Sequence, residues 1–397
     1  MRLEWSEHDE EFRRELQAWL ADNPPPPYGL WGGRQSSADM PDWAREWQRR
    51  LFDGGWLVPG WPPEWGGRNA TPAQQMIYFE ELSAREIPRS VNPQGLSIVT
   101  PSIIDHGTPE QIERWAVPTL RAEIAWCLGM SEPGAGSDLA GLSTRAVLEG
   151  DEYVVNGQKV WTSGAHDADW CLCFVRTDAE APKHRGISAL IIDMATPGIT
   201  TRPLPELTSP DYADFNEVFF DDVRVPAANL LGEENHGWPI TQGSLAHERA
   251  MLWITNTNSL QRSVEAFLEL GREERGDGTR LRDDARFRDE AGHLFLDAQA
   301  AMLMGYRGFS KAAAGKPAPE HILLKLFTSE AERRLCLAAM EALGPDGIDQ
   351  TIEGRMILRP GSWADQYLRA FSGTIAGGTS EIQRNIIAER VLGLPRR

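Results

Sequence analysis

The spacing of apolar residues divides this chain into three regions. Up to about residue 122, apolar positions recur every three or four residues, which is the period of a helix, and Pro and Gly separate the segments. The segment "DWAREWQRRLFDGGW" predicts a helix that ends at Gly54-Gly55. The segments "TPAQQMIYFEELSARE" and "TPEQIERWAVPTLRA" predict helices with a Thr cap and Pro at the first position, at Thr71-Pro72 and Thr108-Pro109.

The period changes to two in the middle of the chain. The stretch "DEYVVNGQKVWTSG" alternates around Asn156-Gly157 and predicts a hairpin with a tight turn there. The segments "DWCLCFVRTD", "ISALIIDM" and "FNEVFFDDVRVP" predict further strands. Residues 123–231 are therefore expected to form a β-domain, as a small barrel or sandwich.

From Gly237 the helical period returns and predicts helices over residues 238–271, 283–314, 318–343 and 379–391. The order helices, strands, helices favours an α+β fold. We expect an N-terminal helical domain over residues 1–122, a middle β-domain over 123–231 and a C-terminal helical bundle over 232–397.

Charge and composition exclude several classes of protein. A net charge of -18 without a basic patch argues against binding to nucleic acid. The charged N-terminal segment "MRLEWSEHDEEFRRELQAWL" lacks the apolar core of a signal peptide, and no stretch is long enough to span a membrane. The four cysteines show no CxxC pair and no metal-ligand spacing, so we expect reduced, buried thiols, no metal site and a cytoplasmic location.

The segment "WCLGMSEPGAGSDLAGLSTRA" (residues 126–146) contains a Gly-rich turn with hydroxyl groups. Such a loop can bind a phosphate or the polar edge of a flat ligand, although its composition fits a plain connecting turn equally well. It lacks the spacing of a GxGxxG motif and no βαβ unit follows it, which disfavours a Rossmann dinucleotide site.

Three segments in this order, "MSEPGAGSD", "YVVNGQKVWTSGA" and "GTSEIQRNIIAERVLG", resemble the acyl-CoA dehydrogenase family, and the resemblance extends over essentially the whole chain. It implies an FAD-dependent enzyme of lipid β-oxidation that introduces an α,β double bond into an acyl-CoA thioester. Electron-transferring flavoprotein is the implied acceptor, and the implied assembly is a homodimer or homotetramer.

The resemblance also implies roles for individual residues. Met130 and Ser131 match positions that line the isoalloxazine ring, Trp161 the indole packed against it and Ser163 the hydroxyl near its reactive nitrogen; by composition alone Trp161 fits a strand core equally well. Gly136 and Ser137 match the turn near the thioester and pantetheine. Thr379 and Glu381 match contacts to the ribityl-pyrophosphate part, at a helix N-terminus that suits phosphate.

The catalytic base of most family members is a Glu directly before "GT", where this chain has Gly377-Gly378. In other members the base lies on a bundle helix that "GSLAHERAMLW" matches, which places it at Glu248. Leu245 and Leu252 lie three and four residues away, so Glu248 shares an apolar helical face. An ion pair is the alternative interpretation of Glu248. Arg249 matches a residue that orders the substrate region, or forms a surface ion pair. The small residues near Gly377 leave room for a bulky acyl group.

The adenosine clamp of the family, "RxxFG…Q" with "QxxGG", is altered here. Arg275 is present, but Gly278 replaces the Phe, Glu341 the Gln and Pro345 a Gly. A carboxylate near a pyrophosphate is unfavourable. The chain is therefore either a homo-oligomer with a changed clamp or the catalytic partner in a heterotetramer with a second chain of this type.

Two further interpretations remain open. One is an oxidase or monooxygenase of the same fold, and the other is a catalytically incomplete subunit that completes the site of another chain.

Overall fold

The computed structural model describes residues 5–27, 36–208, 213–250, 252–349 and 362–395. The side chains of residues 244–250, 252 and 313 lie outside the description. The chain forms two compact units, which are described separately. Unit 1 comprises residues 1–15, 72–87 and 251–397, and unit 2 comprises residues 16–71 and 88–250. These units cut across the three ranges 1–122, 123–231 and 232–397, whose boundaries stay a prediction.

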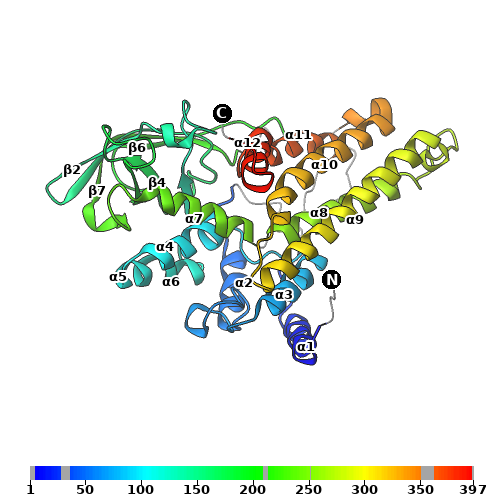
Figure 1. The fold of residues 1–397 in the computed structure, drawn as a ribbon, viewed down its shortest axis with the longest axis horizontal. Helices are drawn as coiled ribbons and strands as arrows, with labels where there is room; N and C mark the ends of the chain where they lie inside the picture. The colour runs from blue at the N-terminus through cyan, green and yellow to red at the C-terminus, as the bar shows by residue number, and fades with distance from the viewer. Residues whose placement is uncertain (1–4, 28–35, 209–212, 251, 350–361, 396–397) are drawn as a thin grey trace. The chain divides into compact units, whose positions relative to one another are not determined.

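Unit 2 contains an eight-stranded mixed sheet (Figure 1). The strand order is β6-β7-β3-β2-β4-β5-β8, and β1 pairs in parallel with β4. The strands are β1 (Trp126–Gly129), β2 (Arg145–Glu149), β3 (Glu152–Lys159), β4 (Trp170–Arg176), β5 (Ile187–Asp193), β6 (Ile199–Pro203), β7 (Asn216–Pro226) and β8 (Leu230–Leu231).

Helical segments of unit 2 pack on both faces of this sheet, and Ala44 joins the core on the face of Cys171 and Cys173. Leu172 and Phe174 of β4 pack with Trp115 and Ile240 from the helical segments, whereas Cys171 and Cys173 point into the core on the other face. Burial on both faces explains why β4 reads as an unbroken apolar run. The helices are α2 (Asp42–Asp53), α4 (Thr100–His106), α5 (Pro109–Gln111), α6 (Val117–Leu120) and α7 (Gly237–Ala250), with short 3-10 or π segments η2 (Pro63–Trp65), η3 (Gly95–Val99), η4 (Ile112–Ala116), η5 (Leu139–Gly141) and η6 (Ala227–Asn229).

Unit 1 is a helical bundle in which α8, α9 and α10 pack along one another (Figure 1). Phe267 and Phe287 stack within its core, with ring centroids 4.6 Å apart. The helices are α3 (Pro72–Ala84), α8 (Leu252–Leu270), α9 (Ala285–Ala313), α10 (Glu320–Leu343), α11 (Trp363–Gly373) and α12 (Ser380–Ile386), with η7 (Leu281–Asp283), η8 (Gly344–Ile348) and η9 (Ile387–Val391). Helix α1 (Glu7–Asp22) is divided between the two units.

Most of the predicted elements are present. Helix α2 ends at Gly54-Gly55, α3 begins at Pro72, and Thr108 caps α5 in a reciprocal pair of hydrogen bonds with Gln111. The helix predicted over residues 238–271 is described as α7 and α8, on either side of residue 251, which lies outside the description. All four cysteines are buried and free, as predicted. No helix of the described ranges combines the length and apolar character needed to cross a membrane.

The predicted hairpin turn at Asn156-Gly157 is wrong. Both residues lie inside β3. The hairpin between β2 and β3 turns at residues 150 and 151, next to the pair Glu149–Glu152. Gly157 is required for a different reason: a Cβ there would lie 2.6 Å from the Cα of Thr144, and the register with β7 shifts at this point. Gly157 therefore lies at a close approach between strands, next to a bulge in which Asp221 and Asp222 of β7 face one residue of β3. A local sequence pattern cannot distinguish this from a turn.

Candidate functional site

Two loops at the ends of strands bring the predicted flavin-lining residues together. Strand β1 ends before Met130 and Ser131, and β3 ends before Val160 and Trp161. The Val160 N–H donates a hydrogen bond to the Ser131 carbonyl at 2.9 Å. Residues that are far apart in the sequence thus lie on adjoining backbone segments of unit 2.

Trp161 presents its indole ring to the surface. Its side chain is 63% exposed, its φ angle is +60°, and its ring lies edge-on to Phe215 with centroids 5.9 Å apart. The next residue, Thr162, exchanges two backbone hydrogen bonds of 3.1 Å with Asn216, which hold the backbone in this conformation. Exposure excludes the interpretation of Trp161 as a strand core residue. A left-handed backbone and an exposed ring both cost free energy, and a planar ligand would recover part of that cost.

Polar residues lie on the same two backbone segments as the exposed ring. Ser131 and Ser163 are half-buried, and among the hydrogen bonds of the described backbone none is donated by the Ser131 N–H. An aromatic face next to hydroxyl and N–H donors fits a flat heterocycle with a polar edge. The isoalloxazine ring of a flavin has this character, so the residues present fit the cofactor that the sequence predicts.

The predicted thioester turn follows directly. Glu132 and Ala135 exchange two backbone hydrogen bonds of 3.0 Å and close a tight turn. Gly136 and Ser137 are exposed after this turn, and a Cβ at Gly136 would meet no atom within 4 Å. The turn is therefore open to a ligand.

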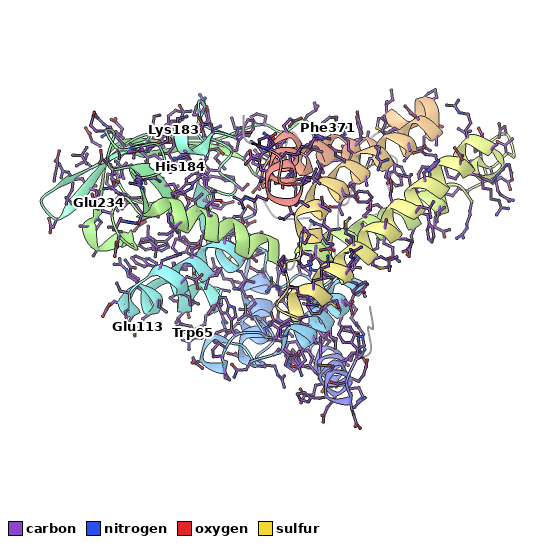
Figure 2. All side chains as sticks on the ribbon, in the orientation of Figure 1. Trp65, Glu113, Lys183, His184, Glu234 and Phe371 are labelled. Atoms are coloured by element: carbon purple, nitrogen blue, oxygen red, sulfur yellow. The ribbon has the colours of Figure 1, made fainter. Side chains whose placement is uncertain are left out.

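In the loop that follows, Asp138 Oδ2 lies 2.6 Å from Nζ of Lys183, which is labelled in Figure 2, and both side chains are exposed.

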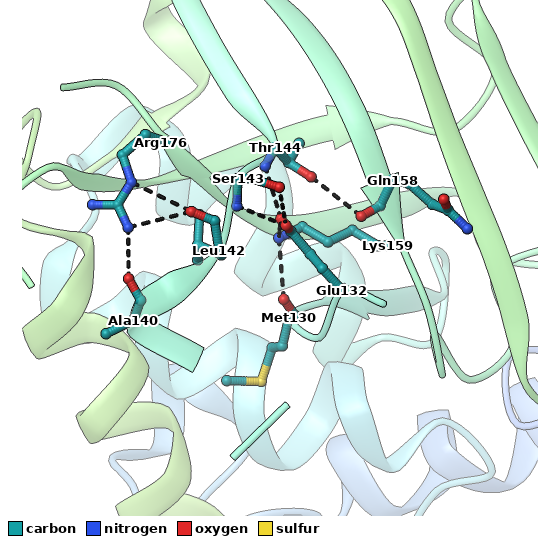
Figure 3. A network of polar contacts seen from close by, with 9 residues as sticks. All are labelled: Met130, Glu132, Ala140, Leu142, Ser143, Thr144, Gln158, Lys159 and Arg176. Carbon is teal, nitrogen blue, oxygen red and sulfur yellow. Dashed lines mark hydrogen bonds and ion pairs between the residues drawn. The ribbon is translucent and has the colours of Figure 1, made fainter. Parts of the chain in front are cut away.

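A buried ion pair beneath these loops was missed by the sequence analysis. Lys159 is fully buried, and its Nζ lies 2.8 Å from Glu132 Oε1 and 3.1 Å from the Met130 carbonyl oxygen (Figure 3). Burial raises the pKa of Glu132, but the Lys159 charge and hydrogen bonds from Thr144 and Ser143 outweigh it and lower the pKa to about 2. The two-residue period of the strand could have indicated the burial of Lys159, because this residue lies on the same face of β3 as Val155 and Gly157.

The glycine turn before α12 is held rigidly within unit 1. Gly377 and Gly378 have φ angles of +66° and +99°. The Gly378 carbonyl accepts a 2.6 Å hydrogen bond from Lys325 Nζ, and the Gly377 carbonyl accepts one of 3.1 Å from Gln383 Nε2. Thr379 follows as the cap of α12.

Thr379 and Glu381 occupy the start of α12, as predicted. Thr379 Oγ1 accepts a hydrogen bond of 3.3 Å from the Ile382 N–H. Glu381 is exposed in the first turn, where hydrogen bonds from its own backbone N–H and from Thr379 lower its pKa. Their contact with a cofactor stays a prediction.

The side chains of Glu248 and Arg249 lie outside the described residues. The backbone places both in the last turn of α7, and α7 contacts β5 and α4 within unit 2. Their roles stay predictions.

The two segments of the altered clamp lie near each other in unit 1. The Arg275 N–H donates to the Thr279 carbonyl, and the Gly278 N–H donates to the Arg275 carbonyl, both at 2.8 Å, which closes a tight turn with φ of +81° at Gly278. Arg275 Nη2 lies 3.5 Å from the carbonyl oxygen of Ala342 in α10. The exposed Glu341 directly precedes Ala342 in α10, and Arg275 is also exposed.

A depression of about 460 Å³ lies elsewhere in unit 2. His166, Asp169 and Asp193 are among its lining residues, and none of the predicted site residues lines it. Two carboxylates disfavour the anionic phosphates of CoA there, so we place the candidate site at the loops around Ser131 and Trp161.

Three domain families match successive parts of the chain. They are the acyl-CoA dehydrogenase N-terminal domain over residues 6–123, the middle domain over 127–223 and the C-terminal domain over 235–392. The predicted order of helical, β and helical regions is therefore confirmed.

Full-length relatives give the same result. The chain is 37% identical to acyl-CoA dehydrogenase IpdE1 of Mycobacterium tuberculosis, over 98% of both chains. It is 41% identical to FadE34 of the same organism, over 88% of this chain and 46% of that protein. Among solved structures, the Tcur3481-Tcur3483 steroid ACAD matches all of both chains with a TM-score of 0.82 at 28% identity. The ChsE4-ChsE5 complex from M. tuberculosis matches all of both chains with a TM-score of 0.81 at 32% identity.

Proposed function

Since the chain belongs to the acyl-CoA dehydrogenase family, we propose that it introduces an α,β double bond into an acyl-CoA thioester, with Glu248 as the base. The observation that supports a flavin enzyme most directly is the exposed Trp161 ring, which follows Val160 on a segment hydrogen-bonded to the Ser131 loop. When bound, FAD supplies the acceptor for the hydride that leaves the β-carbon. Met130, Ser131, Trp161 and Ser163 would hold its ring.

The remaining residues are assigned from the family pattern. Thr379 and Glu381 would hold the ribityl and diphosphate part of FAD, and Arg275 its adenosine part. Gly136 and Ser137 would bind the thioester end of the substrate. Arg249 would order the substrate next to the base. Gly377 has no side chain and cannot accept a proton, so Glu248 is the carboxylate that removes the α-proton. Desolvation by an apolar acyl group would raise its pKa toward the operating pH.

The test mixes the flavin-loaded protein with an acyl-CoA under anaerobic conditions. The loss of visible absorbance measures the rate at which the bound flavin is reduced. We expect Glu248→Gln to bind flavin and ligand but to lose at least a hundredfold in the rate of reduction, because general-base catalysis contributes about 10²–10⁴-fold. Glu265→Gln is the matched control, since Glu265 is exposed on α8. Reduction of the Glu248→Gln protein at the wild-type rate would remove Glu248 from the mechanism.

We infer that the acyl group is bulky. Ala376, Gly377 and Gly378 leave space where other members carry a Glu, and one similar structure is titled a steroid ACAD. A CoA thioester with a polycyclic acyl group should therefore reduce the flavin faster than a straight-chain acyl-CoA. The reverse order would contradict the assignment.

The assembly is the second open point, and we propose that the altered clamp is completed by a partner subunit. The support is the exposed Glu341 in place of the Gln of the clamp, next in sequence to Ala342, whose carbonyl Arg275 approaches, together with a similar structure that is a complex of two named chains, ChsE4 and ChsE5. The visible absorption spectrum of the chain purified alone tests this. A colourless, folded protein supports the heterotetramer or the incomplete-subunit interpretation, and about one flavin per chain supports a homodimer or homotetramer.

We assign electron-transferring flavoprotein as the electron acceptor and the cytoplasm as the location. The four free, buried thiols support a reducing compartment. An oxidase or monooxygenase would instead consume oxygen with every turnover, so stoichiometric oxygen uptake by the reduced protein would favour that second candidate function.

A further inference from the structure

The fully buried lysine at the end of β3 is the starting point. Lysine is almost never fully buried without a partner, because removing its charge from water costs several kcal/mol. Lys159 has a relative exposure of 0%, and its ammonium group has two oxygen partners in unit 2, the Glu132 carboxylate at 2.8 Å and the Met130 carbonyl at 3.1 Å (Figure 3).

The carboxylate partner is fully occupied. Glu132 Oε2 accepts hydrogen bonds from the N–H and the hydroxyl of Ser143, at 2.6 and 2.8 Å, and Oε1 accepts one from the Thr144 N–H at 2.9 Å. Glu132 is therefore fixed to the start of β2 independently of Lys159. The ion pair joins the end of β3 to this loop after β1.

The bonds of Lys159 fall on both sides of Ser131. Its ammonium group binds the carbonyl of residue 130 and the carboxylate of residue 132, while the Val160 N–H binds the Ser131 carbonyl at 2.9 Å. The loop residues 130–132 are thus held by Lys159 and by Val160, which follows β3. A hydrophobic pair of similar volume would stabilise the fold as well or better, so packing alone does not account for the charges.

The charge of Lys159 acts on the peptide group between Met130 and Ser131. Its carbonyl accepts from an ammonium group, and its N–H, the one on Ser131, donates to no acceptor among the described backbone groups. Hydrogen bonds polarise one another in a low-dielectric interior, so a charged donor on the C=O strengthens the N–H of the same peptide as a donor.

We propose that Lys159 is a positioning residue that orients and polarises the Met130–Ser131 peptide, so that the Ser131 N–H stabilises negative charge on the reduced ring of a flavin bound at these loops. This inference rests on the proposed function, since it takes FAD as the ligand. It assigns to Lys159 and Glu132 an influence on flavin affinity and reduction potential. Neither residue touches the substrate.

The two partners should shift the potential in opposite directions. Lys159→Met removes the polarising charge and should weaken binding of the reduced flavin relative to the oxidised flavin by about tenfold, which lowers a two-electron potential by about 30 mV. Glu132→Gln keeps the ammonium group and removes its counter-charge, so the potential should rise. Arg176→Met is the matched control: Arg176 binds the carbonyls of Ala140 and Leu142 in the same region but not that of Met130 (Figure 3).

The experiment uses the full chain reconstituted with FAD, with its partner subunit if one is required. It measures the FAD dissociation constant, the midpoint potential and the thermal unfolding of each variant. A change in thermal unfolding alone, with equal potentials in the wild type, Lys159→Met and Glu132→Gln, would overturn the proposal and leave a purely structural ion pair.

Lys159→Arg keeps a cation and is the second test, should Lys159→Met fail to fold. Lys159→Arg should bind FAD and have the midpoint potential of the wild type. A variant with the thermal unfolding of the wild type that does not bind FAD would count against the assignment. A wild-type protein that binds FAD but is not reduced by any acyl-CoA would refute the proposed function alone. The potentials of the variants would still decide the role of Lys159.

Discussion

A carboxylate placed at Gly377 should take over from a missing base at Glu248. The variant is Glu248→Gln combined with Gly377→Glu, and the geometry of the turn permits it. The φ angle of Gly377 is +66°, within the left-handed region, and a Cβ added there would meet no atom within 4 Å. The cost is therefore the backbone penalty of about 1–2 kcal/mol, offset by about 0.4–1 kcal/mol from the lower entropy of the unfolded chain. We expect a net loss of about 1 kcal/mol.

The neighbouring glycine provides the stability control. Gly378 has φ of +99°, and a Cβ there would lie 2.7 Å from Nε2 of Gln383, which itself binds the Gly377 carbonyl. Gly378→Ala should therefore cost more than Gly377→Glu, about 2 kcal/mol or above. Urea unfolding of the two single variants measures both values. Equal losses would show that the turn does not have the described geometry.

The activity assay compares Glu248→Gln/Gly377→Glu with Glu248→Gln/Gly377→Gln, which have the same shape at both positions and differ in one carboxylate. Flavin reduction by straight-chain acyl-CoA should be at least about tenfold faster in the first, a part of the 10²–10⁴-fold available to a general base. The gain should shrink with bulky acyl groups, because the new side chain fills their space. Equal rates in the two double variants for every acyl length would show that a carboxylate at residue 377 cannot replace that of Glu248.

Three further outcomes follow from the described contacts. The folded pKa of Glu132, about 2, lies below its ordinary value of 4.5, so its contribution to stability is complete above pH 4.5 and is lost as the pH falls toward 2. Over this range the free energy of unfolding in urea should fall by about 3 kcal/mol more in the wild type than in Glu132→Gln. The same pH dependence in both proteins would contradict this. Trp161→Ala should weaken FAD binding by up to about tenfold with an unfolding midpoint near that of the wild type, whereas a large loss of stability would indicate a core role. Gly157→Ala should cost about 1–3 kcal/mol in urea unfolding, because its Cβ would lie 2.6 Å from the Cα of Thr144; a neutral effect would show that the strands can separate.

Elements set by local patterns were predicted from the sequence. The helix ends at Gly54-Gly55 and Pro72 follow from capping and backbone preferences that act within one turn. Helix α11 was missed, although Ser362 and Asp365 form a reciprocal cap that the spacing S-x-x-D indicates. The motifs around Met130 and Trp161 indicated the candidate site for a similar reason, because each is a short contiguous segment.

Other features depend on contacts between distant segments. The sequence around Gly157 fits a hairpin turn, and only its pairing with β7 and the close approach of Thr144 place it inside a strand. Trp161 reads as a core residue by composition, yet the bonds of Thr162 to Asn216 hold its ring at the surface.

By itself, the sequence determined the order of the elements, the family and the segments that carry the candidate site, because periodicity, caps and contiguous motifs are local properties. Only the tertiary structure decided that Lys159 is buried against Glu132 and the Met130 carbonyl. The physical reason is that an isolated lysine in a strand gives no indication of its partner. The free energy of burying its charge depends on oxygens that the fold brings from other strands and loops.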